Sequence, residues 1–223
     1  MKIQIVQNVL KANKDMADDN RRLLGGAGLL ALNLMSSPGS GKTTLLERTI
    51  PALGPEQPCA VLVGDLQTTR DAERVGDVAV AVTQINTGTG CHLSAVQVAE
   101  ALKGVDLGAI AYLFIENVGN MVCPAAFDLG EHRKVVLLSV PEGDDKVAKY
   151  FTLFQQADLI LITKIDLIEV CGFDMARVRA DLDKINTRAP VIPLSTRTGE
   201  GFDAWLAWLK AQHNEVTASP RVR

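Results

Sequence analysis

The segment from Leu30 to Thr44 restricts the fold of this chain more than any other part of the sequence. An apolar run, Leu-Ala-Leu-Asn-Leu-Met, leads into Ser-Ser-Pro-Gly-Ser-Gly-Lys-Thr-Thr and then into a helical pattern. Gly39 and Gly41 allow backbone N–H groups to surround an anion that a Cβ would crowd. The helix that follows presents its positive N-terminal end to the same anion. This order of strand, glycine-rich loop, Lys-Thr and helix predicts a P-loop that binds nucleotide phosphates.

This loop supplies the predicted phosphate-binding and magnesium-binding groups. The Lys42 ammonium is expected to reach the β- and γ-phosphates, and the Thr43 hydroxyl is expected to bind Mg²⁺. The pattern G-x-x-x-x-G-K-[ST] has glycine where this chain has Ser36, so an ordinary glycine-rich turn is the alternative. The Lys-Thr pair and the preceding apolar strand favour the nucleotide site. The predicted nucleotide-binding residues of the loop are Pro38, Gly39, Ser40, Gly41, Lys42, Thr43 and Thr44.

Predicted strands alternate with predicted helices along the rest of the chain. Buried strands are predicted where apolar residues run continuously to a turn, at 30–35, 59–65, 109–116 and 158–164, and further strands are predicted at 134–140 and 191–194. Thr83-Gln84-Ile85 is a candidate for a short strand. Helical patterns lie between them, at 45–53, 72–75, 93–102, 146–156, 175–187 and 202–212. The alternation predicts a doubly wound, mostly parallel α/β sheet with helices on both faces, the P-loop NTPase fold. Ligands of such sheets bind at the carboxyl ends of the strands.

We expect residues 1–223 to form a single P-loop domain, since this length does not require two. Apolar residues at roughly helical spacing predict an N-terminal helical segment over 1–25, which Gly25-Gly26 should end. This segment is expected to pack on the sheet, and its polar face leaves a contact with a partner as the alternative. Residues after about 213 are polar and are expected to form a frayed tail.

Charge and composition exclude several functional classes. The net charge is −3 and no basic block is present, so no nucleic-acid surface is expected. No apolar run reaches about 18 residues, so no membrane span is expected. The start, Met-Lys-Ile-Gln-Ile, is not a secretory signal, and the 4 cysteines do not resemble a disulfide framework. These features predict a protein of the reducing cytoplasm.

The sequence Thr163-Lys164-Ile165-Asp166 is the candidate motif for recognition of the nucleotide base. The Asp166 carboxylate can accept hydrogen bonds from guanine N1–H and N2–H₂, a pair that adenine does not offer. The Lys164 stem can lie along the base, while its ammonium contacts the P-loop. GTP-binding proteins usually have Asn-Lys-x-Asp here, so Thr163 is a departure, and a helix-start turn capped by Asp166 is the alternative. After the last predicted strand, Ser195 and Thr196 are expected to contact the base from its other side.

The sequence Glu116-Asn117-Val118-Gly119 follows another buried strand and occupies the place of the usual Asp-x-x-Gly of GTPases. We expect Glu116 to hold Mg²⁺ through a water molecule. The Gly119 N–H is expected to sense the γ-phosphate.

Two further acids are predicted to assist at this metal ion. Asp65 ends a neighbouring strand, and Asp71 lies in the segment expected to act as the first switch; helix capping is the alternative for both. With Lys42 and Glu116 they form the predicted catalytic set. Asn120 follows Gly119 where a glutamine would position water, so slow intrinsic hydrolysis is expected.

Cys91, His92 and Cys123 form a candidate site for Ni²⁺ or Zn²⁺. Thiolate and imidazole groups are ligands for both metals. On spacing alone a loop cysteine is equally consistent with a small buried residue. The position of both loops beside the predicted nucleotide switches favours a metal site, whose fourth ligand could come from a two-fold dimer, water or a solute. Cys59 is expected in the core, and Cys171 is expected to be incidental.

Together these motifs resemble the hydrogenase nickel-incorporation GTPases, the HypB family of the SIMIBI class of P-loop proteins. The resemblance covers almost the whole chain, and its motifs occur in the family's order. They are 36–44, Gly64-Asp65-Leu66-Gln67-Thr68, Asp71-Ala72-Glu73-Arg74, Asn86-Thr87-Gly88, Cys91-His92-Leu93, Glu116-Asn117-Val118-Gly119-Asn120 and Thr163-Lys164-Ile165-Asp166.

The resemblance implies a GTPase that converts GTP to GDP and phosphate, with Ni²⁺ or Zn²⁺ bound at Cys91, His92 and Cys123. It also implies a GTP-dependent homodimer with this site at its interface. The implied role is nickel delivery to the large subunit of [NiFe]-hydrogenase, together with a small zinc-containing partner of the HypA type. Because residues 1–40 contain no Cys or His, no additional N-terminal nickel site is expected in this chain.

Other functions stay open as alternatives. The urease nickel GTPase has Cys-Pro-His as its metal motif, whereas Cys91 and His92 are adjacent here. A chaperone of a cobalamin enzyme would not need this pair. A small-molecule kinase would require an acceptor substrate, and a metal-storage protein would be expected to have a His-rich tract.

Overall fold

A computed structural model describes residues 2–65 and 69–218 of the chain. The strands are β1 (Leu30–Ser36), β2 (Cys59–Asp65), β3 (Ala81–Asn86), β4 (Tyr112–Glu116), β5 (Arg133–Ser139), β6 (Leu159–Thr163) and β7 (Val191–Leu194). The α-helices are α1 (Lys2–Ala27), α2 (Lys42–Leu53), α3 (Arg70–Gly76), α4 (Ala95–Leu102), α5 (Lys146–Lys149), α6 (Phe151–Gln155), α7 (Ile168–Cys171), α8 (Met175–Ile185) and α9 (Phe202–Ala218). Short 3₁₀ turns are η1 (Leu107–Ala109), η2 (Cys123–Ala126), η3 (Val140–Glu142) and η4 (Ile165–Leu167).

The strands form a 7-stranded sheet in the order β3-β2-β4-β1-β5-β6-β7. Every neighbouring pair is parallel. All residues of β1 are buried, because β1 lies between β4 and β5 and both of its faces are covered. The predicted doubly wound α/β fold is confirmed, and the chain order reverses at β1, where ligands of such sheets bind.

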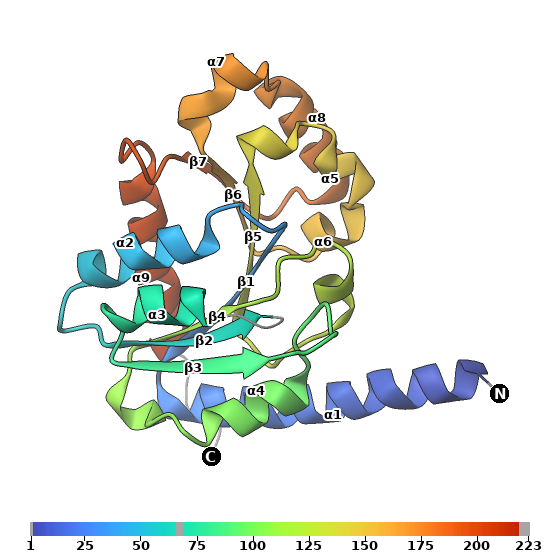
Figure 1. The fold of residues 1–223 in the computed structure, drawn as a ribbon, viewed down its shortest axis with the longest axis vertical. Helices are drawn as coiled ribbons and strands as arrows, with labels where there is room; N and C mark the ends of the chain where they lie inside the picture. The colour runs from blue at the N-terminus through green and yellow to red at the C-terminus, as the bar shows by residue number, and fades with distance from the viewer. Residues whose placement is uncertain (1, 66–68, 219–223) are drawn as a thin grey trace.

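Helices cover both faces of this sheet (Figure 1). Helices α2, α3 and α9 pack on one face, where Leu45, Val75 and Trp205 belong to a core with Leu32 and Phe114. On the other face, α1 and α4 cover one half, and α5, α6 and α8 cover the other half. The core is mostly aliphatic, as expected from an aromatic content of 4%.

Several predicted boundaries differ from the structure. Helix α1 continues through Gly25-Gly26 to Ala27, because Leu24 and Leu29 stay packed on the sheet and the first positive φ, 77°, is at Gly28. The single helix predicted over 146–156 is two short helices that break at Tyr150. The fraying expected from about residue 213 is wrong as far as Ala218, because α9 continues to that residue. Part of the predicted first switch, 66–68, lies outside the described residues.

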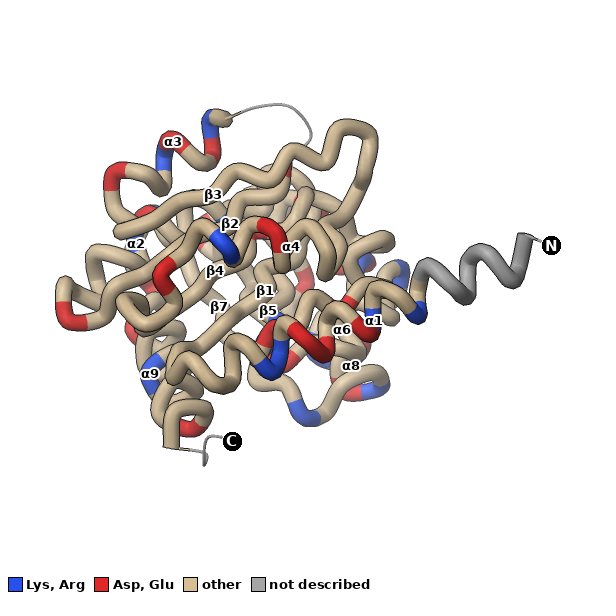
Figure 2. The backbone as a smooth tube through the Cα atoms, turned by 90° about the horizontal axis from the view of Figure 1, so that it is seen from below, with Lys and Arg blue, Asp and Glu red and all other residues tan. Residues whose placement is uncertain are grey.

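Positions of Lys and Arg are interspersed with positions of Asp and Glu along the backbone, including α1 and α8 (Figure 2). This mixture agrees with the net charge of −3. Among residues 2–65 and 69–218, no helix is both long enough and apolar enough to cross a bilayer.

Two buried asparagines fasten α1 to the rest of the domain. The Asn13 amide accepts from the Ala95 N–H at 2.8 Å and donates to the Asp128 carbonyl at 2.8 Å. About two helical turns further along α1, the Asn20 amide donates to the carbonyls of Ala95 and Leu129, both at 2.9 Å. Helix α1 therefore joins the start of α4 to the loop before β5.

We expect Asn20→Ala to lower the free energy of unfolding by about 1–3 kcal/mol, because two buried carbonyls would lose their donor. Urea denaturation followed by circular dichroism measures this change. The matched control is Asn214→Ala on the exposed face of α9, for which a change within about 0.5 kcal/mol is expected. Equal losses for the two variants would contradict the anchoring role of Asn20.

Candidate functional site

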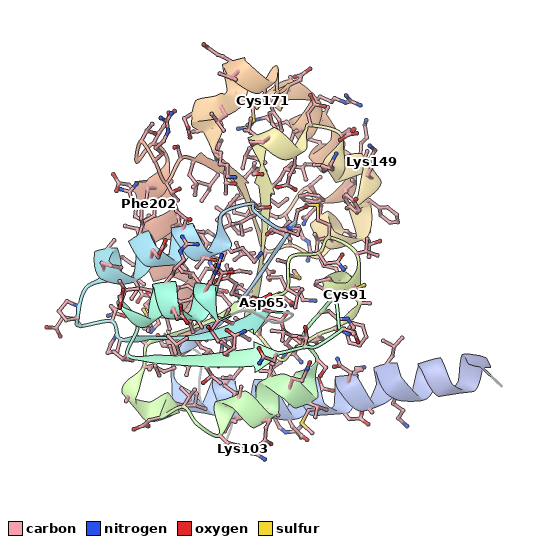
Figure 3. All side chains as sticks on the ribbon, viewed as in Figure 1. Asp65, Cys91, Lys103, Lys149, Cys171 and Phe202 are labelled. Atoms are coloured by element: carbon pink, nitrogen blue, oxygen red, sulfur yellow. The ribbon has the colours of Figure 1, made fainter. Side chains whose placement is uncertain are left out.

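A cleft of about 370 Å³ opens at the carboxyl ends of β1, β2 and β4, beside α2 and α3. Its lining includes most of the predicted P-loop, the acids Asp65, Asp71 and Glu116, and Gly119 and Lys164. Asp65 lies near the middle of the molecule, and Cys91 lies on a loop to its right in the view of Figure 3. The structure thus brings together predicted residues that are more than a hundred positions apart in the chain.

The loop between β1 and α2 has the backbone geometry of an anion cradle. Gly39 and Gly41 have φ of 75° and 96°, a region that residues with a Cβ rarely adopt. The Lys42 ammonium donates to the Ser36 hydroxyl at 3.0 Å, so serine at this position anchors the lysine rather than weakening the loop. Burial lowers the pKa of Lys42, and the carboxylates of Glu116, Asp71 and Glu142 oppose that shift.

Ser40 belongs to this loop, but its side chain does not line the cleft. It is fully buried, and its hydroxyl lies 2.9 Å from the Ser37 carbonyl and 2.6 Å from Glu142 Oε1. The backbone of Ser40 therefore remains the part that could contact a phosphate.

Thr43 and Glu116 meet at the bottom of the cleft. The Thr43 hydroxyl donates to Glu116 Oε1 at 2.7 Å. The other oxygen, Glu116 Oε2, is buried without a hydrogen-bond partner among the described residues. Burial raises the pKa of Glu116, and the Lys42 ammonium and the Thr43 hydroxyl act against that shift. A hydroxyl beside an unsatisfied carboxylate oxygen fits a Mg²⁺ ion, which prefers oxygen ligands.

The remaining predicted residues of the phosphate region also line the cleft. Asp65 ends β2, and Asp71 lies on the first turn of α3, where Arg74 Nη1 is 3.4 Å from its carboxylate. A Cβ at Gly119 would lie 2.8 Å from the Pro38 backbone, so only glycine allows the two loops this close.

The predicted base-binding segment, 163–166, is hydrogen-bonded to the P-loop. The Thr163 hydroxyl donates to the Ser40 carbonyl at 2.8 Å, and the Lys164 ammonium donates to the Gly39 carbonyl at 2.7 Å. Lys164 is the non-glycine residue with positive φ, 60°, in the described part of the chain. Thr163 thus performs a tethering contact from the position where GTP-binding proteins usually have asparagine.

Asp166 carries partners on both carboxylate oxygens in this structure. Ser195 Oγ donates to Oδ1 at 2.5 Å, and Arg197 Nε donates to Oδ2 at 2.9 Å. These bonds, led by that from Ser195, lower the pKa of Asp166 and keep it ionised. The neighbouring Thr196 takes part through its carbonyl, which accepts from Arg48.

The ligand atoms of Cys91, His92 and Cys123 all lie within 4.8 Å of one another. The two sulfur atoms are 2.7 Å apart, and Cys91 Sγ is 3.8 Å from His92 Nδ1. The His92 ring stacks on Phe127, with ring centroids 3.8 Å apart. Three groups of this kind, brought together from two loops, fit a soft or borderline divalent metal such as nickel or zinc.

The electrostatics of this cluster suit a metal ligand set. Burial lowers the pKa of His92, so its imidazole is neutral near pH 7 and can donate a lone pair. The hydrogen-bonded Cys91 raises the pKa of Cys123, and a bound cation would act in the opposite direction. The helix predicted from residue 93 begins at Ala95 with Ser94 as its cap, so Cys91 and His92 lie in the loop that precedes α4.

The other two cysteines lie as expected. Cys59 is buried in β2, where burial raises the pKa of its thiol to about 12, and Cys171 is exposed at the end of α7. Neither belongs to the metal cluster.

Sequence reasoning missed three residues that support the cleft. Glu142 accepts hydrogen bonds from the Ser40 hydroxyl and the Ser139 N–H. Arg197 donates to the Asp166 carboxylate, and Arg74 Nη2 donates to the Thr44 hydroxyl at 2.9 Å. Glu142 carried one available signal, because it is an acid shortly after a buried strand, as are Asp65 and Glu116. Arg74 lies within the 71–74 motif that carries the family resemblance, although no role was predicted for its side chain, whereas nothing in the sequence pattern distinguished Arg197 from an ordinary surface arginine.

Comparisons with known proteins agree with this geometry. The family described as CobW/HypB/UreG, nucleotide-binding domain, matches residues 30–193. The hydrogenase maturation factor HypB of Azotobacter chroococcum mcd 1 is 50% identical over 213 residues, covering 94% of this chain and 69% of that protein. The probable HypB of Methanocaldococcus jannaschii is 44% identical and is covered over 97% of its length, together with 96% of this chain.

Solved structures show the same relationship. HypB from Helicobacter pylori, crystallised in complex with nickel, has a TM-score of 0.87 and 40% identity, over 92% of this chain and 96% of that one. HypB from Archaeoglobus fulgidus has a TM-score of 0.86 and 42% identity, over 92% of this chain and 100% of that one. The chain therefore belongs to the CobW/HypB/UreG family of nucleotide-binding domains and, within that family, to the HypB hydrogenase maturation factors.

Proposed function

We propose that this chain is a GTP-hydrolysing nickel metallochaperone that inserts nickel into the large subunit of [NiFe]-hydrogenase. The observation that carries the proposal is the clustering of Cys91, His92 and Cys123 ligand atoms within 4.8 Å, beside the turn that follows Glu116. Relatives named hydrogenase maturation factor support the client, and a relative crystallised with nickel supports the cargo.

The base-binding segment supports guanine as the base. Asp166 is ionised and lies in a turn whose neighbours Lys164 and Thr163 bind the P-loop. The Arg197 side chain is 73% exposed, so it can leave Oδ2 at little cost when a base offers two donors. Ser195 supports Asp166 from the turn after β7, and Ser195 and Thr196 are the proposed contacts with the other side of the base.

The phosphate end supports hydrolysis assisted by Mg²⁺. When bound, the ion would neutralise charge on the β- and γ-phosphate oxygens, and Thr43 and Glu116 would hold it. Lys42 binds the same phosphates, Asp65 and Asp71, which also line the cleft, assist at the ion, and the Gly119 N–H senses the γ-phosphate. The Asn120 side chain is engaged with the Cys91 carbonyl at 3.3 Å and with the Val122 N–H at 2.8 Å, which supports slow hydrolysis without a partner.

Nickel is the cargo of the proposed reaction. The trio supplies three ligands, so a second copy of the chain in a GTP-dependent homodimer would complete the site at its two-fold axis. A small zinc-containing protein of the HypA type is the proposed partner in delivery, and the cytoplasm, where thiols stay reduced, is the proposed compartment. A urease client is the second candidate, because a 46% identical relative from Helicobacter hepaticus is named a hydrogenase/urease maturation factor.

One experiment tests the core of this proposal. Nickel titration and sedimentation are measured together, once with GDP and once with a non-hydrolysable GTP analogue. We expect nickel affinity and dimer fraction to change with the nucleotide. If the protein binds GTP but its nickel affinity is the same with both nucleotides, it would instead be a GTPase with another client.

We expect Asp166→Asn to weaken GTP binding by about 10²- to 10⁴-fold, because each charge-assisted hydrogen bond contributes about 1.5–3 kcal/mol. The same variant should gain affinity for xanthosine triphosphate, whose C2 carbonyl matches the new amide donor. Fluorescent-nucleotide titration measures both affinities. Asp174→Asn, which keeps the cap of α8 and changes a residue outside the cleft lining, is the control. Unchanged GTP affinity in the Asp166 variant would place the base elsewhere.

We expect Cys91→Ser and Cys123→Ser each to lower nickel affinity by more than about 100-fold, since loss of a residue that only supports a ligand already costs 10- to 100-fold. Thiolate-to-nickel charge-transfer absorption should disappear in both variants. Cys171→Ser, which changes an exposed thiol outside the cluster, should leave both signals unchanged. Retained nickel absorption in Cys91→Ser would remove that residue from the site.

We expect single-turnover hydrolysis of GTP by the isolated chain to be slower than about 1 s⁻¹, because the side chain after Gly119 is turned toward Cys91 rather than toward a water nucleophile. Rapid-quench measurement of phosphate release checks this rate. Faster hydrolysis without any partner would show that another group positions the water.

A further inference from the structure

Three buried polar side chains form a hydrogen-bonded chain that starts at Asn117, in the lining of the nucleotide cleft, and runs into the centre of the domain. Asn33 lies in β1, Asn117 follows β4, and Glu131 precedes β5. Their exposed fractions are 0%, 1% and 5%, respectively. No step of the proposed hydrolysis or nickel binding uses these side chains, yet buried polar groups are costly unless they are hydrogen-bonded.

At one end of this hydrogen-bonded chain of side chains, Asn117 joins the turn after Glu116 to the loop that carries Cys91 and His92. Asn117 Oδ1 accepts from the Val118 N–H at 2.9 Å and from the Leu93 N–H at 3.2 Å. Val118 precedes Gly119, whose N–H is the proposed γ-phosphate sensor, and Leu93 directly follows His92. One amide oxygen therefore holds a peptide of the switch and a peptide of the metal loop together.

The other end of this hydrogen-bonded chain of side chains reaches the segment between Cys123 and β5. Asn117 Nδ2 donates to Asn33 Oδ1 at 3.2 Å, and Asn33 Nδ2 donates to Glu131 Oε1 at 3.2 Å. Glu131 Oε2 accepts from the Leu129 N–H at 2.8 Å. Leu129 closely follows Phe127, whose ring stacks on His92.

The acceptor role of both Glu131 oxygens sets the direction of these bonds. Oε1 accepts from Asn33 and Oε2 accepts from the Leu129 N–H, so Asn33 presents its NH₂ to Glu131 and its oxygen to Asn117. Asn117 must then present its own oxygen to the two backbone N–H groups. Burial raises the pKa of Glu131, while the Lys134 ammonium, 4.0 Å from Oε1, favours the charged form.

We propose that Glu131 and Asn33 are positioning residues that orient Asn117 and thereby couple the nucleotide state to the metal loops. The inference rests on the proposed function, because it assumes that nucleotide and nickel binding influence each other. A shift of the Val118–Gly119 peptide toward a γ-phosphate changes the bond from Val118 to Asn117. The same oxygen then moves relative to Leu93, beside the His92 ligand.

The experiment measures the coupling itself rather than either affinity alone. The nickel dissociation constant is determined with GDP and with a non-hydrolysable GTP analogue, and the ratio of the two constants is the coupling. The variants are Glu131→Gln, which keeps the shape but removes the acceptor-only group, and Asn33→Leu, which interrupts the chain. The control is Asn186→Leu, because Asn186 is also buried but lies outside this chain of side chains, at the end of α8, where it donates to the Phe154 and Ala157 carbonyls.

We expect a ratio within the usual range of about 5- to 150-fold in the unmodified protein. The ratio should fall toward one in Glu131→Gln and Asn33→Leu, while the control keeps the unmodified ratio even though it loses stability. Variants that keep the unmodified ratio, or a control that loses it equally, would overturn the inference. A ratio of one in the unmodified protein would instead overturn the proposed function, and the inference with it.

Hydrogen exchange of the unmodified protein gives a second test that does not depend on the folding of a variant. Amide exchange at Leu93 and Leu129 should differ between the GDP and analogue complexes, since both N–H groups belong to the chain. Equal exchange at both amides in the two complexes, with Gly119 changing as a positive control, would contradict coupling through these residues.

Discussion

The pairing of β1 with both β4 and β5 is the constraint on which the rest of this protein depends. Backbone hydrogen bonds on both edges place the end of β1 beside Glu116 on one side and Leu137 on the other. The P-loop leaves β1 at that point, so its phosphate cradle faces the acid from β4 and the Glu142 support from β5. A parallel sheet can provide this arrangement only where the direction of winding reverses.

The nucleotide and metal sites share β4 and its following turn. Glu116 faces the cleft, Asn117 faces the interior, and Asn120 contacts the Cys91 carbonyl. Consecutive residues of one turn thus belong to two sites, which makes reciprocal influence between them a physical expectation. Helix α1 also contacts the segments that carry the metal ligands. Asn13 accepts from the Ala95 N–H, after the Cys91–His92 loop, and Asn20 donates to the Leu129 carbonyl, in the segment after Cys123.

The two departures from common GTPase motifs have local physical reasons. Ser36 provides a hydroxyl that accepts from Lys42, and Thr163 provides one that donates to Ser40. Each is a short side chain at the end of a fully buried strand, where a hydroxyl finds a partner within reach. The consensus residue is therefore replaceable when the contact it makes can be formed by another polar group.

The strand–loop–helix order, the parallel sheet, and the acids and thiols at strand ends could all be predicted from the residues, because periodicity and loop chemistry are local properties. The sequence could not determine that α1 continues to Ala27, since a glycine pair ends a helix only when packing does not hold it. It also could not reveal the partners of Asp166 or the chain from Leu93 to Leu129. Those contacts join residues of different strands and loops, and only the tertiary structure decides which buried donor meets which acceptor.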